Sequence, residues 1–160
     1  MVILSNMFTG YFAKLKEYEK AGLIPVSIAL KSPDWYHGIE YKKLAPTWDI
    51  LNSWKNGVYK NDINHYTQEF KKQILDKLDI NTVLHDLLNI SENKLHNVIL
   101  LCYEKPGDFC HRHLVADWIT EIGQFISYAF IGNVIEYDAL KIILTNKDCE
   151  RLKEIEHNIR

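Results

Sequence analysis

A chain of 160 residues with 47% hydrophobic and 25% charged residues has the composition of a globular domain that can bury its own core. Its formal net charge of -2 argues against a protein that covers a long stretch of nucleic acid, although a local basic pocket stays open. The three cysteines have no paired spacing, so we expect reduced thiols rather than a disulfide framework, which fits a cytoplasmic protein.

The hydropathy of the chain indicates no membrane association. The first residues lack the basic segment, the long apolar segment and the cleavage site of a signal peptide. No apolar run approaches the roughly 20 residues that cross a bilayer. There is no repeat, low-complexity tract or linker, and we therefore expect one domain over residues 1–160.

The first third of the chain predicts a strand, a helix and a second strand. Residues 2–4 form a short apolar run, residues 8–21 carry apolar side chains at a helical period, and residues 24–30 read as a buried strand. This order normally gives parallel strands joined by a right-handed crossover.

An irregular aromatic segment, residues 31–48, follows the second strand at the edge of the sheet where a ligand is expected. A long loop in this place is usually functional. Trp35, Tyr36 and Tyr41 could close over a ligand, or could only pin the loop by their own packing, and both alternatives stay open. Lys31 is a candidate phosphate partner.

Three helices are expected before the next strand. Pro46 or Thr47 opens the first, Asn61 or Asp62 caps the second, which reaches about residue 78, and Asn81 caps a short third.

The central stretch, residues 97–118, organises the chain. Residues 98–101 are continuously apolar, which is typical of a strand covered on both faces. Pro106 and Gly107 break the run, and Asp108 is a candidate N-cap for a helix over about 109–121. Open α/β sheets bind anions and nucleotides where a strand's carboxyl end meets a helix's amino end, so we expect the site here.

The remaining elements complete an α/β fold. Residues 125–130 and 134–137 are expected strands, the second at an edge, and terminal helices are expected from about residue 138. We predict a Rossmann-like three-layer sandwich around a mostly parallel sheet of four or five strands.

Cys110, His111 and Arg112 fall in the first turn of the central helix, where free backbone N–H groups favour anions. Arg112 is a candidate for bidentate hydrogen bonding to a phosphate or carboxylate of the ligand. Alternatively, it pairs with a nearby carboxylate of the protein.

The reactive side chains of this turn have alternative roles. Cys110 could be a nucleophile with a lowered pKa, or a small buried hydrophobic residue. Glu104 or Asp108 could serve as a general base, or hold His111 in one tautomer, or act only as turn and capping residues.

A third hypothesis for this turn is a metal site. Cys110 and His113 share a helix face, with His111 and Asp108 nearby, but zinc needs three or four converging ligands. Since no second pair with ligand spacing is present, we predict no metal and no cofactor.

The motif Leu101-Cys-Tyr-Glu-Lys105, followed by Cys110-His-Arg112 and Ala116-Asp-Trp118, resembles the signature of the domain-of-unknown-function family numbered 488. Residues 33–46 and the return strand near 134–136 are similar to its longer branch. The resemblance implies a compact α/β domain with a largely parallel sheet and supplies no established reaction. Many members carry an arginine after the second strand, and the resemblance suggests that Lys31 supplies the positive charge of that arginine in this chain.

These observations predict a pocket at the start of the helix near residue 109 that binds a nucleotide or a nucleotide-derived phosphate ligand. Its candidate residues share this edge of the sheet and are Arg112, His111, Cys110, Lys31, Trp35, Tyr36 and Glu104. The alternative is an enzyme that acts on a phosphoester or N-glycosidic bond through Cys110 and His111. A nucleic-acid partner fits the acidic balance less well, and the terminal helices could serve a homodimer.

Overall fold

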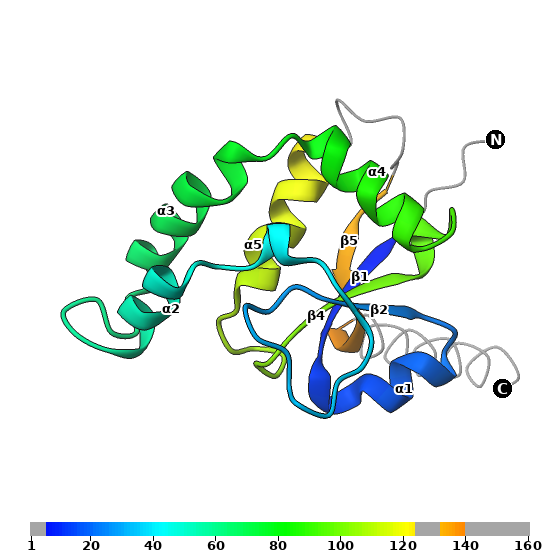
Figure 1. Cartoon of the computed structure of the whole chain (residues 1–160), viewed down its shortest axis with the longest axis horizontal. Helices are drawn as coiled ribbons and strands as arrows, with labels where there is room; N and C mark the ends of the chain where they lie inside the picture. Colours follow the sequence, from blue (N-terminus) through cyan, green and yellow to red (C-terminus); the bar gives the residue numbers. More distant parts are fainter. Residues whose placement is uncertain (1–5, 124–131, 140–160) are drawn as a thin grey trace, which may run out of the picture.

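The computed structural model describes residues 6–123 and 132–139 (Figure 1). The described strands are β1 (Met7–Tyr11), β2 (Ile24–Ser27), β3 (Ile39–Glu40), β4 (Val98–Cys102) and β5 (Val134–Glu136). They form one sheet in the order β3-β2-β4-β1-β5, and every pairing is parallel. The sheet has the parallel strands and strand number that the sequence predicts.

The described helices are α1 (Leu15–Lys20), α2 (Trp48–Lys55), α3 (Ile63–Gln73), α4 (Ile80–Ile90) and α5 (His111–Trp118). Four 3₁₀ turns (Phe12–Lys14, Lys42–Leu44, Leu75–Lys77 and Leu95–Asn97) and a π-helical turn (Ile119–Gly123) flank them. No helix in the described part of the chain is both long and apolar enough to span a membrane.

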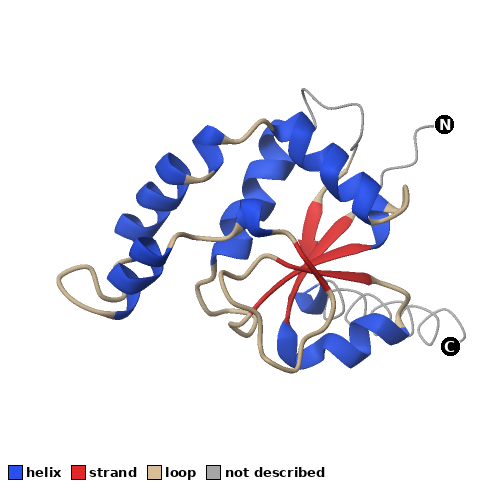
Figure 2. Cartoon of the chain, in the orientation of Figure 1, coloured by secondary structure: helices blue, strands red, loops and turns tan. Residues whose placement is uncertain are grey.

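The sheet is the middle of three layers, with α1 on one face and α4 and α5 on the other (Figure 2). The side chains of successive residues in β4 point to opposite faces of the sheet. Val98 and Leu100 belong to the larger apolar cluster with side chains of α3, α4 and α5, whereas Ile99 and Leu101 pack with Phe12 of the opposite cluster. All five residues of β4 are buried, which confirms the predicted central strand.

The first strand lies in a different segment from the one predicted. Residues 8–11, expected to begin a helix, belong to β1 (Met7–Tyr11) between β4 and β5, and the helical backbone begins only at Phe12. Pairing on both sides overrides the helical spacing of the apolar residues. β1 and β2 are therefore parallel but separated by β4. The predicted strand at 2–4 lies outside the described residues, as do the one at 125–130 and nearly all of the terminal helices.

Helix caps decide several element boundaries. Thr47 and Asp62 accept hydrogen bonds from the backbone N–H groups of their first turns, and each is one of the two candidates that the sequence gives for the start of α2 and of α3. Asp79, not Asn81, caps α4. Cys110, not Asp108, occupies the N-cap position of α5, so this helix begins at His111, two residues later than predicted. The second strand ends at Ser27 rather than residue 30.

Gly10 in β1 leaves room for the phenol of Tyr18. A Cβ at this position would lie 2.6 Å from Tyr18 Oη and 2.8 Å from Ile99 Cδ1. Tyr18 cannot move freely, because its hydroxyl donates to Asp138 and accepts from the backbone N–H of Tyr11. We expect Gly10→Ala to lower the free energy of unfolding by about 1–3 kcal/mol, the cost of overpacking. Urea denaturation measures it, and a loss below about 0.5 kcal/mol would show that Tyr18 yields at little cost.

Candidate functional site

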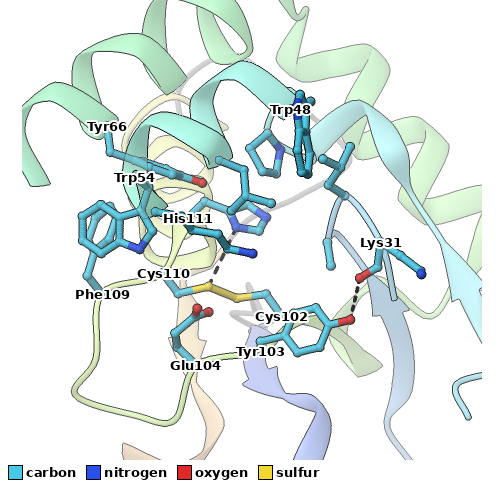
Figure 3. Close-up of a pocket in the computed structure, with 15 residues that line it drawn as sticks. Lys31, Trp48, Trp54, Tyr66, Cys102, Tyr103, Glu104, Phe109, Cys110 and His111 are labelled. Carbon is cyan, nitrogen blue, oxygen red and sulfur yellow. Dashed lines mark hydrogen bonds between the residues drawn. A yellow bond between two sulfur atoms is a disulfide. The ribbon is translucent and has the colours of Figure 1, made fainter. Parts of the chain in front are cut away.

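A cavity of about 570 Å³ opens at the carboxyl ends of β2 and β4, against the amino end of α5 (Figure 3). Its walls come from the segments after β2 and β4, from α2 and α3, and from the start of α5. The lining residues are Ala29, Leu30, Lys31, Pro46, Trp48, Leu51, Trp54, Lys55, Tyr66, Cys102, Tyr103, Glu104, Phe109, Cys110 and His111. The volume lies within the range of small-molecule sites, roughly 300–1,000 Å³.

Aromatic rings make up much of one wall. Trp54 of α2 lies 5.0 Å from Phe109 and 5.7 Å from Tyr66 of α3, measured between ring centroids. Tyr66 and Phe109 meet edge to face at 5.1 Å. Trp48 lies across the cavity from this cluster in Figure 3 and is 65% exposed. Rings so placed offer faces and edges to a flat aromatic ligand.

His111 lies in the cavity wall with a defined tautomer. Its Nε2 donates a hydrogen bond to the carbonyl oxygen of Ile28 at 2.7 Å, so Nδ1 carries the lone pair. Burial lowers the pKa of the ring to about 4, with a further lowering from the charge of Arg112. The ring is therefore neutral at pH 7, and its Nδ1 faces Cys110 Sγ at 3.8 Å.

Cys102 and Cys110 form a disulfide in this structure. The expectation of reduced, unpaired thiols is wrong here, because the turn between β4 and α5 brings a strand end and a helix start together. The two sulfurs and one ring nitrogen of His111 lie within 4.8 Å of one another, so that after reduction of the disulfide the three residues form a group that could hold a metal ion. Spacing in the sequence groups Cys110 with His113 and does not include Cys102.

Arg112 is fully buried and does not line the cavity. Its Nε and Nη2 donate to the carboxylate of Glu136 at 3.1 and 3.3 Å. Its Nη1 donates to the carbonyl oxygen of Glu104 at 2.6 Å and to Cys102 Sγ at 3.2 Å. Thr9 also donates to Glu136. Of the two roles that the sequence leaves open, the structure shows the pairing with a carboxylate of the protein.

Charged side chains lie among the cavity-lining residues, at its exposed edge. Lys31 and Glu104 are both exposed, and the carbonyl oxygen of Lys31 accepts from the hydroxyl of Tyr103 at 2.6 Å. Burial, with a smaller effect of the charge of Glu104, raises the pKa of Tyr66 well above its ordinary value. With the exposed Lys55, the cavity therefore combines an apolar interior with two cations and one anion among its exposed lining residues.

Trp35 and Tyr36 lie outside the cavity. Both rings meet Phe12 edge to face, with centroids at 6.3 and 5.3 Å, and the hydroxyl of Tyr36 donates to the carbonyl oxygen of Ile39. Tyr41 donates to Asp86. The aromatic residues of the loop therefore pin the loop itself, which is the second of the two roles that the sequence leaves open.

The cavity thus brings together Lys31, Glu104, Cys110 and His111 from the predicted site and leaves out Arg112, Trp35 and Tyr36. Sequence reasoning missed the aromatic residues from α2, α3 and the turn before α5. The residues missed are Trp48, Trp54, Tyr66 and Phe109. No short-range pattern marks them, since they come from three segments. A partial signal is Trp48, which ends the aromatic segment 31–48 and directly follows the capping residue Thr47.

The fold and the site define a Rossmann-like α/β protein with an aromatic-lined cavity at the strand ends. The family model DUF488-N3a, described as the active DUF488-N3 subclade, matches residues 16–123. This match spans more than half of the chain and every cavity-lining residue, so the chain belongs to this family, and the resemblance seen in the sequence is confirmed. Comparison with curated proteins and with solved structures finds no match.

Proposed function

We propose that the cavity binds a nucleotide or a nucleotide-derived phosphate ligand. The observation that carries the proposal is the combination of an aromatic wall with charged groups at the opening of one cavity. A base would stack on the rings, as bases do on aromatic platforms. Glu104 could accept hydrogen bonds from ribose hydroxyls, while Lys31 and Lys55 could pair with the phosphate.

Two matched tryptophans test this proposal with adenosine monophosphate as the probe. Trp48 lines the cavity and is 65% exposed, whereas Trp35 lies outside it and is 54% exposed. We expect Trp48→Ala to weaken binding by about 1–3 kcal/mol, the value of one base stacked on one ring. Trp35→Ala should leave the affinity unchanged, since its ring packs on Phe12. Isothermal titration calorimetry measures both.

Further probes show how much the base and the phosphate of the ligand each contribute to the affinity. Adenosine should bind more weakly than the monophosphate, and inorganic phosphate more weakly still, if stacking and the cations both contribute. A single-stranded oligonucleotide that binds more tightly than any mononucleotide would favour a strand end as the natural ligand. Equal loss of affinity in the Trp48 and Trp35 variants would contradict the proposed location.

One observation favours an enzymatic alternative. Cys110 Sγ lies 3.8 Å from Nδ1 of a neutral His111, and this geometry suits a nucleophile and base once a thiol reductant has supplied the two electrons and two protons that convert the disulfide to thiols. The thiol proton would pass to Nδ1 and the sulfur would attack phosphorus or the anomeric carbon. The alcohol or base would leave with that proton, and water would release the product. Cys110→Ser should then abolish nucleotide cleavage, while Cys149→Ser should not.

A further inference from the structure

We infer that the reduced chain binds one Zn²⁺ through Cys102 Sγ, Cys110 Sγ and His111 Nδ1, with a fourth coordination position open to the cavity. The three ligand atoms lie within 4.8 Å of one another. Two thiolates and one imidazole match a zinc site of the three-ligand type, whose fourth position holds water or a ligand. This inference does not depend on nucleotide binding.

The separation of the two cysteines suits a metal bridge. Their Cα atoms are 7.3 Å apart. Disulfides usually join Cα atoms about 4.4–6.8 Å apart. A zinc ion inserted between two thiolates lengthens the connection, because each Zn–S bond is about 2.3 Å. The backbone therefore already provides the spacing that a sulfur–metal–sulfur bridge needs.

The third ligand is already oriented for coordination. His111 directs Nε2–H to the carbonyl oxygen of Ile28, which leaves Nδ1 facing Cys110 Sγ at 3.8 Å. Metal-binding histidines commonly donate their other ring N–H to a backbone carbonyl in this way, which fixes the tautomer and the ring. In a tetrahedral zinc site a sulfur and a nitrogen ligand are about 3.6 Å apart, close to the distance seen here.

The charges around the site are compatible with a cation. The guanidinium of Arg112 donates to Cys102 Sγ, an N–H···S contact that supports a thiolate, and its charge is offset by Glu136. Two thiolates neutralise Zn²⁺, so the loaded site adds no net charge to the cavity wall. All three ligand residues line the cavity, which leaves an approach for the fourth ligand (Figure 3).

Metal binding and the disulfide exclude each other. A thiol reductant supplies two electrons and two protons to give the two thiols, and Zn²⁺ then displaces both thiol protons as the Zn–S bonds form. Oxidation to the disulfide would release the ion. A metal-bound Cys110 is a ligand and not a nucleophile, so metal occupancy also excludes the enzymatic alternative at this residue.

The test uses the full chain, reduced and freed of metal by a chelator, and titrated without oxygen with Co²⁺ and then Zn²⁺. We expect one Co²⁺ per chain with thiolate-to-cobalt charge-transfer absorption, displaced by one Zn²⁺. Oxidation that removes two of the three free thiols should reduce binding to zero. A reduced, folded wild-type chain that binds no metal, or that gives a cobalt spectrum without thiolate bands, overturns the inference.

Substitution of each proposed ligand residue tests which side chains bind the zinc ion. Cys102→Ser, Cys110→Ser and His111→Gln should each weaken zinc binding by more than the roughly 10–100-fold effect of losing an outer hydrogen bond. The matched control His113→Gln, a described histidine outside the group, should keep the metal. Circular dichroism checks that each variant folds. Undiminished binding in folded Cys102→Ser contradicts the site, and the wild-type titration decides the matter if a variant does not fold.

Discussion

Replacing Arg112 with alanine is expected to lower the free energy of unfolding by about 3–5 kcal/mol, because it leaves the mostly buried carboxylate of Glu136 without its cationic partner. The guanidinium is 0% exposed and the Glu136 side chain only 13%. The variant also loses the hydrogen bonds to the carbonyl oxygen of Glu104 and to Cys102 Sγ, which hold the end of β4 to α5. Urea denaturation, with wild type and variant in the same redox state, measures the loss.

Conservative variants separate the ion pair from a ligand-binding role. Arg112→Lys should recover only part of the stability, since lysine keeps the charge and loses the two-pronged contact. Glu136→Gln should also be destabilising, because it leaves the fully buried guanidinium without its counter-charge, although the amide still accepts one hydrogen bond. If Arg112→Ala keeps wild-type stability and instead weakens binding of adenosine monophosphate, the guanidinium serves a ligand and the structural account fails.

Replacing Phe70 with alanine is expected to cost about 3–5 kcal/mol, as for other fully buried phenylalanines. Phe70 is 0% exposed and is one of two buried residues of α3, the other being Tyr66. Its ring lies 5.5 Å from that of His111 and 6.1 Å from that of Tyr66, measured between centroids. The truncation therefore leaves a hole between α3 and the start of α5.

Phe70→Leu is the matched control, and a loss of about 1 kcal/mol is expected because most of the volume is kept. Because Tyr66 lines the cavity from the same helix, Phe70→Ala should also weaken adenosine monophosphate binding, while Phe70→Leu should largely preserve it. Denaturation and calorimetry on the two variants provide the comparison. A loss below about 1 kcal/mol for Phe70→Ala would show that α3 repacks without this ring.

Part of the site could be predicted because its residues are neighbours in the chain. The apolar run that forms β4, the break at Gly107 and the polar first turn of α5 all lie within residues 98–112. Two parallel strand ends must meet at one sheet edge, so Lys31 after β2 and Glu104 after β4 could also be brought together.

The remaining site residues are decided by contacts between distant segments. Glu136, the partner of Arg112, lies 24 residues further along the chain, and no local pattern selects it from the other carboxylates. Cys102 and Cys110 are close in sequence, but their sulfurs meet only because the turn between them directs the start of α5 back toward the end of β4. The aromatic wall is assembled by α2 and α3 packing beside the strand ends.

The sequence alone determined the α/β class, the buried β4 and the starts of α2 and α3 to within one residue, because periodicity and capping act over a few residues. The tertiary structure alone decided that residues 7–11 form a strand, since their ladder partners are about 90 and 127 residues away. It likewise decided that Arg112 is buried against Glu136 while His111 faces the cavity. Adjacent residues of one helical turn point in different directions, and only the packing of the sheet shows which direction is inside.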